Sequence, residues 1–477
     1  MNDQQPFRPK ARLPRGFRDR DEAELAAERR MLETIRRVYE SYGFAALETS
    51  SLEYADALGK FLPDQDRPNE GVFSFADDDG QWLSLRYDLT APLARYVAEN
   101  FQQLPKPFRR YQVGTVWRNE KPGPGRFREF TQFDADTVGS ASPAADAELL
   151  MMMADTLEAL GLKRGEYAIK VNSRKLLDGV LNLAGVDLSR RGTVLRAIDK
   201  FDRLGQAGVC ALLGEGRKDE SGDFTRGAGL DARQIEAVMA LVSGTTAFSN
   251  LGAGLGNDIL AIQEILAANG YGNDRIAFDA GVVRGLDYYT GAVYEAQLTF
   301  PVTNEAGETV VFGSVGGGGR YDDLVARFTG QTVPAAGFSI GVSRLLTALK
   351  ARAGAETFAT NPLIVVLALD KAEIAASFAL AREIREGGLR AEAYVGESGM
   401  KAQLRYADKR GAAIAVIEGS DERARGEVTL KDLALGAELA KATESRAAWV
   451  KDRPAQQSVK REALVESLRA MLAARGS

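Results

Sequence analysis

The sequence predicts an α+β protein in which a strand-rich part is interrupted by a helical insertion and followed by a small α/β domain. The chain has 477 residues, more than the ~250–300 at which a single hydrophobic core stops growing. Between residues 174 and 274, apolar residues recur at helical spacing and strand patterns are few. After residue 362, strand and helix patterns alternate, which is typical of a small α/β domain.

The composition is that of an ordinary globular protein, with 45% hydrophobic and 27% charged residues. Cys210 is the only cysteine, which excludes an intrachain disulfide and a cysteine zinc site and favours a reducing cytoplasm. The sequence contains no histidine. Catalysis must therefore use carboxylates, arginines, tyrosines, backbone groups or groups of the substrate, and no metal site is predicted from the side chains.

The sequence also argues against membrane insertion and secretion. Its longest apolar run, 362–369, is far shorter than the ~20 residues of a membrane helix. The N-terminus has no apolar segment of the kind that a secretory signal contains. The net charge of −5 counts against a non-specific nucleic-acid binder, but it allows a specific RNA enzyme with a local basic patch.

The expected elements divide the chain into six parts. A helix at 22–42, ended by Gly43, precedes strands at 44–47, 82–87, 111–118 and 128–137 and a helix at 144–161. Strands return at 275–278, 293–300 and 309–312, and a helix begins near 342. Strands at 363–369, 391–395 and 412–418 then alternate with helices at 371–386 and 399–410. We expect a main domain in two parts (1–173 and 275–350), the insertion 174–274, a linker 351–361, a second domain 362–450 and an extension 451–477.

The most informative stretch runs from Arg110 to Asp136 and contains two strands joined by the loop 119–125. Alternate residues of the second strand share one face, and these are Arg128, Phe130, Gln132, Asp134 and Asp136. For an arbitrary strand, a polar face is usually a solvated one. Here the face includes an aromatic ring, and the opposite face is not clearly apolar, so the pattern favours the floor of a ligand site. Arg118 and Arg126 flank the loop and could bind phosphate.

Three further motifs are each weak alone. Tyr288 and Tyr289 are adjacent, so in a strand they point to opposite faces and cannot both enter one core. Four glycines at 316–319 predict a loop whose backbone approaches a ligand or another chain closely, although the P-loop ending and the GxGxxG spacing are missing. Arg344 follows Gly341 in the first turn of a predicted helix, where a surface arginine is the simpler interpretation.

Together these segments resemble the class II aminoacyl-tRNA synthetases and, among them, the histidyl-tRNA synthetase family. Residues 116–130 resemble class II motif 2, residues 341–344 resemble motif 3, and the helix 22–42 with the strand after it resembles motif 1. The segment 284–289, RGLDYY, and the segment 318–322, GGRYD, are similar to the two signatures of the histidyl family, and 85–90 is similar to a further segment. The resemblance covers roughly residues 10–450, with the motifs in order.

The resemblance implies an antiparallel class II catalytic sheet flanked by helices, with residues 362–450 as an anticodon-binding domain. It implies that histidine reacts with ATP to give histidyl-adenylate and pyrophosphate, and that the histidyl group is then transferred to tRNA(His). Mg²⁺ is expected on the pyrophosphate side of ATP. The implied partners are L-histidine, tRNA(His) and a second copy of the chain in a cytoplasmic homodimer.

The resemblance also assigns roles to individual residues. Arg118 and Arg284 are implied as the catalytic arginines at the α-phosphate. The ATP site would consist of Arg118, Phe130 against adenine, Glu120 on the adenine amino group, and Arg126 and Arg344 on the outer phosphates. The histidine site would consist of Asp88, Thr90, Gln132, Asp136, Arg284, Tyr288 and Tyr289.

The sequence departs from the family pattern in three places. Ser50 or Ser51 stands where motif 1 usually has proline, and Ser343 stands where motif 3 usually has an acidic residue. The loop 121–125 offers few side chains for reading the acceptor end of tRNA.

Two alternatives share the fold. One is the histidine-binding regulatory subunit of ATP phosphoribosyltransferase, a non-catalytic relative that usually lacks the C-terminal domain and several ATP-binding arginines. The other is a synthetase for another amino acid, such as the prolyl or threonyl enzyme, against which the segment 284–289 argues.

Overall fold

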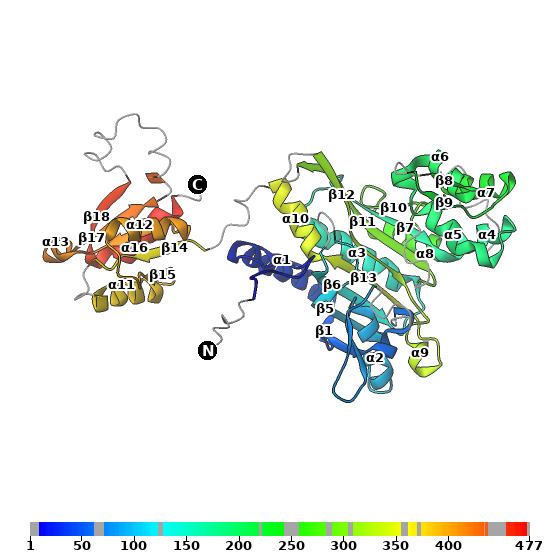
Figure 1. Cartoon of the computed structure of the whole chain (residues 1–477), viewed down its shortest axis with the longest axis horizontal. Coiled ribbons are helices and arrows are strands. Elements are labelled where there is room, and N and C mark those ends of the chain that lie inside the picture. Colours follow the sequence, from blue (N-terminus) through cyan, green and yellow to red (C-terminus); the bar gives the residue numbers. More distant parts are fainter. Residues whose placement is uncertain are drawn as a thin grey trace, which may run out of the picture. The chain divides into compact units, whose positions relative to one another are not determined.

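The computed structural model describes most of the chain, in two separate units. The described residues are 9–61, 71–122, 127–218, 222–242, 257–282, 289–303, 309–353, 361–369, 374–433, 435–436 and 455–474. The first unit spans Met1–Phe358 and the second Ala359–Ser477 (Figure 1).

An eight-stranded sheet with the order β1-β5-β6-β13-β12-β11-β7-β10 is the frame of the first unit. Its strands are β1 (Ala45–Ala46), β5 (Phe108–Trp117), β6 (Glu129–Val138), β13 (Ala335–Gly341), β12 (Thr309–Arg320), β11 (Ala292–Thr303), β7 (Tyr167–Ser173) and β10 (Ile276–Phe278). The central strands are antiparallel, and only the edge strands β1 and β10 run parallel to their neighbours. The expected antiparallel sheet with flanking helices is confirmed, with parallel edges as the one difference.

Helices cover one face of this sheet and form the main core with it. They are α1 (Glu22–Ser41), α3 (Pro143–Ala159), α8 (Asn257–Ala268) and α10 (Val342–Ala353). Asp21 caps α1 by accepting a hydrogen bond from the backbone of Glu24. Phe133 and Ala135 of β6 belong to this core. The expectation that this face of β6 is not clearly apolar is therefore wrong, because the polar Glu129 and Thr131 stand only at the start of the strand.

The four glycines at 316–319 lie within β12, so the expected loop is wrong. They pair with β11 on one side and with β13 on the other. A Cβ on Gly318 would lie 2.1 Å from the carbonyl oxygen of Gly337. The neighbouring strand therefore leaves no room for a side chain, and glycine marks close backbone approach here as it does in some strands.

The insertion has a core of its own. Its helices are α4 (Arg174–Leu183), α5 (Leu188–Ile198), α6 (Phe201–Leu213) and α7 (Ala232–Val242), with a hairpin of β8 (Gly216–Lys218) and β9 (Phe224–Arg226). They pack through residues such as Leu176, Val194 and Leu213 and lie together at the β10 end of the sheet (Figure 1). The helix α8 packs instead into the main core, through Ile259 and Ile262.

Smaller elements cover one end of the other sheet face. They are β2 (Leu52–Tyr54), η1 (Ala55–Phe61), β3 (Ser74–Ala76), β4 (Trp82–Leu85), α2 (Thr90–Asn100) and α9 (Ala326–Thr329). The strands pair in the order β2-β4-β3. Val97 of α2 belongs to one buried cluster with Val138 of β6 and Val325, so α2 is fixed above the end of β6.

The second unit is a five-stranded sheet with the order β15-β14-β16-β17-β18. Its elements are β14 (Leu363–Val366), α11 (Ile374–Glu386), β15 (Arg390–Ala393), α12 (Met400–Lys409), β16 (Ile414–Ile417), α13 (Ser420–Ala424), β17 (Glu427–Asp432), β18 (Gln456–Lys460), η5 (Arg461–Ala463) and α16 (Leu464–Ala473). The strand β18 pairs with β17, and Leu464 and Leu468 of α16 are fully buried. Residues 456–473, to which the sequence pattern gives no role, therefore complete this unit. None of the described helices has the length and apolar composition needed to cross a bilayer.

Candidate active site

The sheet face opposite the helices of the main core carries a transverse row of polar residues. Asp134 of β6 lies directly between Gln112 of β5 and Ser339 of β13. The row continues through Gly317 of β12 to Glu295 of β11. Gln112, Asp134 and Glu295 are all buried. Burying polar groups is costly unless they have partners, so this face is not a solvated outer surface and has the character of a ligand floor.

Asp136 lies in the next row. The Arg110 guanidinium, fully buried, lies 2.8 Å from Oδ2 of Asp136, and the Tyr321 hydroxyl donates a hydrogen bond to Oδ1. A Cβ on Gly337 would lie 2.0 Å from that Oδ1, and a Cβ on Gly319 would lie 2.8 Å from the Tyr289 ring. Because Gly337 and Gly319 pair directly, the row brings Asp136 and Tyr289, two of the predicted histidine-site residues, to one part of the floor. Burial raises the pKa of Asp136, although Arg110 opposes this shift.

The backbone of the segment 87–90 accepts hydrogen bonds from two arginines, Arg110 of β5 and Arg118 just after β5. Nε of Arg118 donates to the carbonyl of Tyr87 at 3.2 Å, and Nη2 of Arg110 donates to the carbonyl of Leu89 at 3.0 Å. Asp88 accepts a hydrogen bond from the backbone of Ala91 at 3.0 Å, in the first turn of α2. Burial raises the pKa of Asp88. Asp88 and Thr90, the first residue of α2, are therefore held next to the Arg110–Asp136 pair.

Arg118 and Phe130 form a second group on the floor. The guanidinium carbon of Arg118 lies 5.1 Å from the centre of the Phe130 ring, within cation–π range. Gln132 follows on the same face of β6, and its Nε2 donates to the hydroxyl of Ser339 at 2.9 Å. The floor thus presents an arginine with an aromatic ring at one end of β6 and a carboxylate cluster at the other.

The other predicted ATP-site residues are less closely joined to this pair. Glu120 is exposed just after β5, and its carbonyl accepts from Nε of Arg128 at 2.9 Å. Arg344 is exposed in the first turn of α10 and donates to the carbonyl of Phe312. The Ser343 hydroxyl accepts from the backbone of Thr131 at 3.1 Å. The residue that replaces the usual acidic one of motif 3 therefore ties the start of α10 to β6.

Arg126, Arg284 and Tyr288 lie outside the described residues. Three residues of the site, Arg110, Tyr321 and Ser339, were not predicted from the sequence. Asp134 was predicted on the floor by its strand parity, which it shares with Gln132 and Asp136, but it was given no role. Tyr321 stands in a recognised motif, but its side chain could not be aimed at Asp136 without the strand register. The preceding Arg320 points to the helix side, where it forms a buried ion pair with Asp146 of α3.

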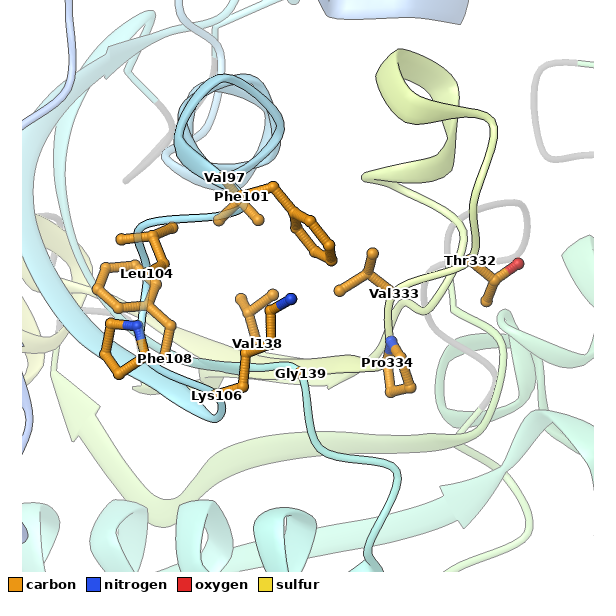
Figure 2. A pocket seen from close by; sticks show the side chains of 11 residues that line it. Val97, Phe101, Leu104, Lys106, Phe108, Val138, Gly139, Thr332, Val333 and Pro334 are labelled. Atoms are coloured by element: carbon orange, nitrogen blue, oxygen red, sulfur yellow. The ribbon is translucent and has the colours of Figure 1, made fainter.

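A separate cavity of about 180 Å³ lies beyond the end of β6. Figure 2 shows Val97 of α2 and Phe101, the residue after α2, facing Val138 and Val333 across it. Its lining is apolar except for Lys106 and Thr332 and contains no carboxylate, so it differs in chemistry from the polar floor. Among the described residues, no group of three or more acidic or cysteine side chains is placed to hold a metal ion.

Comparison with known proteins gives the family. Residues 16–345 match the histidyl-tRNA synthetase family model, and residues 363–471 match the anticodon-binding domain. The chain belongs to the histidyl-tRNA synthetase family. A relative from Brucella abortus (strain S19), named histidine–tRNA ligase, is 56% identical over 483 residues, which cover 97% of this chain and 96% of that one. The predicted family is thereby confirmed.

Solved structures of histidyl-tRNA synthetases show the same fold. The enzyme from Nostoc sp. PCC 7120 aligns with a TM-score of 0.70 at 26% identity and covers 97% of this chain and 100% of its own. A Bacillus halodurans C protein, described as an ATP phosphoribosyltransferase regulatory subunit/histidyl-tRNA synthetase, aligns with a TM-score of 0.64 at 21% identity and covers 84% of this chain and 97% of its own. The second likeness concerns the fold alone, so the fold does not separate a ligase from a regulatory subunit.

Proposed function

We propose that this chain is a histidine–tRNA ligase. It activates histidine with ATP to give histidyl-adenylate and pyrophosphate, and it then transfers the histidyl group to the 3′ end of tRNA(His). Membership of the histidyl-tRNA synthetase family supports this function. The structural observation that carries it is a single polar floor that holds the Arg118–Phe130 pair and the Arg110–Asp136 pair, with the segment 87–90 bonded to both arginines.

In the first step, the histidine carboxylate attacks the α-phosphorus of ATP in line, and pyrophosphate leaves. The step creates no new covalent bond to the protein, so the residues act by positioning and by stabilising charge. Arg118 and Arg284 bind the α-phosphate, because a guanidinium stays charged and can donate two parallel hydrogen bonds. Phe130 stacks on adenine, Glu120 accepts from its amino group, and Arg126 and Arg344 bind the outer phosphates. Mg²⁺ enters with ATP, on its pyrophosphate side.

Histidine occupies the carboxylate end of the floor. Its side-chain and ammonium partners are Asp88, Thr90, Gln132, Asp136, Tyr288 and Tyr289, and Arg284 lies between amino acid and phosphate. The fixed position of Asp136 supports this role, since Arg110 and Tyr321 hold both of its oxygens. A buried acceptor that is left unpaired disfavours ligands without a matching N–H group.

In the second step, the terminal ribose hydroxyl of tRNA attacks the adenylate carbonyl, the bond from that carbonyl carbon to the phosphate oxygen breaks, and AMP leaves. The chain has no histidine to act as base, so a phosphate oxygen of the adenylate takes the proton of the hydroxyl. The second unit binds the anticodon, which the match of residues 363–471 supports. The enzyme works as a cytoplasmic homodimer. The exposed Leu52, Tyr54 and Phe75 on the three-stranded sheet support an interface with a second copy.

The function is tested by aminoacylation. The purified protein is incubated with ATP, radiolabelled histidine and a tRNA(His) transcript, with a tRNA for another amino acid as the control. We expect label on tRNA(His) alone. A protein that binds histidine but charges no tRNA would instead be a regulatory relative.

A further inference from the structure

Asp134 is a buried carboxylate in the centre of the floor, to which the proposed mechanism gives no role. Its side chain is 2% exposed, and its Oδ1 atom has no hydrogen-bond partner in the part of the chain that the structure describes. It lies between Gln132 and Asp136 on the same face of β6. Burying an unsatisfied carboxylate oxygen is costly, so an acceptor left open at this place on the floor fits a site that receives a donor from a ligand.

The neighbours of Asp134 are committed to other groups. The Arg110 guanidinium pairs with Asp136 and the Leu89 carbonyl. Arg86, the next buried arginine, donates to the backbone carbonyls of Thr49 and Thr115. The carboxylates of Asp88, Asp134 and Asp136 therefore gather around one arginine that is paired to a carboxylate. Within the described part of the chain, Arg110 Nε and Gln112 Nε2 also lack partners, but neither donates to Asp134 Oδ1. Among the described residues, three carboxylates therefore share one arginine, and a histidine ligand supplies both a hydrogen-bond donor and positive charge.

The shape of the floor next to Asp134 suits a flat ring. Ser339 of β13 pairs with Gly317 of the next strand, β12, and Gly337 of β13 pairs with Gly319 of β12. These glycines present no side chains, and the Tyr289 ring lies against Gly319. A planar group lying on this glycine surface would have Tyr289 on one side and Asp134 on the other. The Ser339 hydroxyl accepts from Gln132, which leaves its own hydrogen free to orient the Asp134 carboxylate.

We propose that Asp134 is a positioning residue for the histidine substrate and that its carboxylate accepts a hydrogen bond from a ring N–H of imidazole. The proposal rests on the proposed function and extends it to substrate specificity. A floor that presents a carboxylate to the ring favours imidazole over rings of the same shape without that N–H group.

The test compares D134N with the wild type in histidine-dependent ATP–pyrophosphate exchange. Asparagine keeps the size of the side chain but replaces one carboxyl oxygen with an NH₂ group, which donates hydrogen bonds and accepts none. We expect the KM for histidine to rise about tenfold or more, with the KM for ATP unchanged. We also expect the preference for histidine over β-(4-thiazolyl)alanine, in which sulfur replaces a ring N–H, to shrink by a similar factor. T137V is the matched control. Thr137 is as deeply buried, and its hydroxyl also has no partner among the residues that the structure describes, but it lies on the opposite face of β6.

Three results would overturn the inference while leaving the ligase function intact. They are an unchanged KM for histidine in an active D134N, an equal rise in the KM for ATP, and an unchanged preference over the thiazole analogue. If D134N does not fold, as judged by circular dichroism, the variant D134S decides by the same measurements, because it also removes the carboxylate and leaves Gln132 and Ser339 in place. A wild-type protein without histidine-dependent exchange would refute the proposed function itself.

Discussion

Arg118 is the described residue on which the proposed ATP chemistry depends most. We expect R118K to lower kcat/KM for ATP–pyrophosphate exchange by about 10²–10³-fold, because lysine keeps the charge but cannot bind phosphate with two parallel bonds. R109K is the control: Arg109 also lies over an aromatic ring, 4.7 Å from the centre of Phe44, but on the helix-covered side of β5. An equal decrease of kcat/KM in both variants would show that Arg118 supports the folded structure and does not act on ATP directly.

Arg284 is proposed from the family resemblance alone. We expect R284A to reduce adenylate formation sharply in single-turnover measurements, because a positive charge at the α-phosphate is needed in the transition state. The molecular mass of the R284A variant in solution, measured by light scattering, should equal that of the wild type. An unaltered rate of activation would remove Arg284 from the mechanism.

The pH dependence of stability provides a test of Asp134. Burial, and secondarily the Asp136 carboxylate, raises its pKa from 3.8 to about 8. The charged groups that face it are Asp136, Asp88, Arg110 and Arg86. A raised carboxyl pKa means that the folded state binds the proton more tightly than the unfolded state. The stability gained from this tighter binding is complete below the unfolded pKa of ~4. It is lost as the pH rises towards 8.

We therefore expect the free energy of unfolding of the wild type without ligand to fall more steeply between pH 5 and 8 than that of D134N. Urea unfolding at several pH values measures this difference. Parallel pH profiles for the two proteins would contradict it.

At the scale of single residues, the sequence predicted the parts of the floor that follow from strand parity. Gln132 and Asp136 were identified because alternate residues of a strand share a face. Arg110 and Ser339 were missed because their position depends on how β5 and β13 align with β6, which no local pattern specifies. Asp134 was on the predicted face but received no role.

Among the strands, β13 supplies a matched pair of glycines for testing the floor. A Cβ on Gly337 would lie 2.0 Å from Asp136 Oδ1, whereas a Cβ on Gly341 would have its nearest contact at 3.5 Å. Asp136 cannot move easily, since Arg110 and Tyr321 hold it. We expect G337A to raise the KM for histidine and to destabilise the fold by about 1–3 kcal/mol, as overpacking does. G341A should leave the KM for histidine unchanged in the same exchange assay, and equal effects of both variants would refute this account of the floor.

Elements with a clear period were predicted well, and elements defined by their neighbours were not. The helix α1 was found almost to the residue because Leu32, Ile35, Tyr39 and Tyr42 recur at helical spacing. The glycine row of β12 was taken for a loop, since glycine is rare in strands and its reason here is the close approach of β11 and β13. The strand β13 was not predicted, because its residues are mostly small and do not alternate clearly between apolar and polar.

For the whole molecule, the separation into two units predicts that the two reaction steps can be uncoupled. A chain that ends at residue 454 lacks β18 and α16, and with them the fully buried Leu464 and Leu468. Loss of each such leucine costs about 2–5 kcal/mol, so the second unit should unfold. We expect pyrophosphate exchange to persist while aminoacylation falls strongly. A chain that ends at Ala474 is the control, and retained aminoacylation in the shorter chain would contradict the role of the second unit.

We propose that the polar floor of the large sheet activates histidine with ATP. The most direct test is ATP–pyrophosphate exchange by the purified chain, with each of the twenty amino acids supplied separately. We expect exchange with histidine alone. Exchange with another amino acid, or binding of histidine without any exchange, would contradict it.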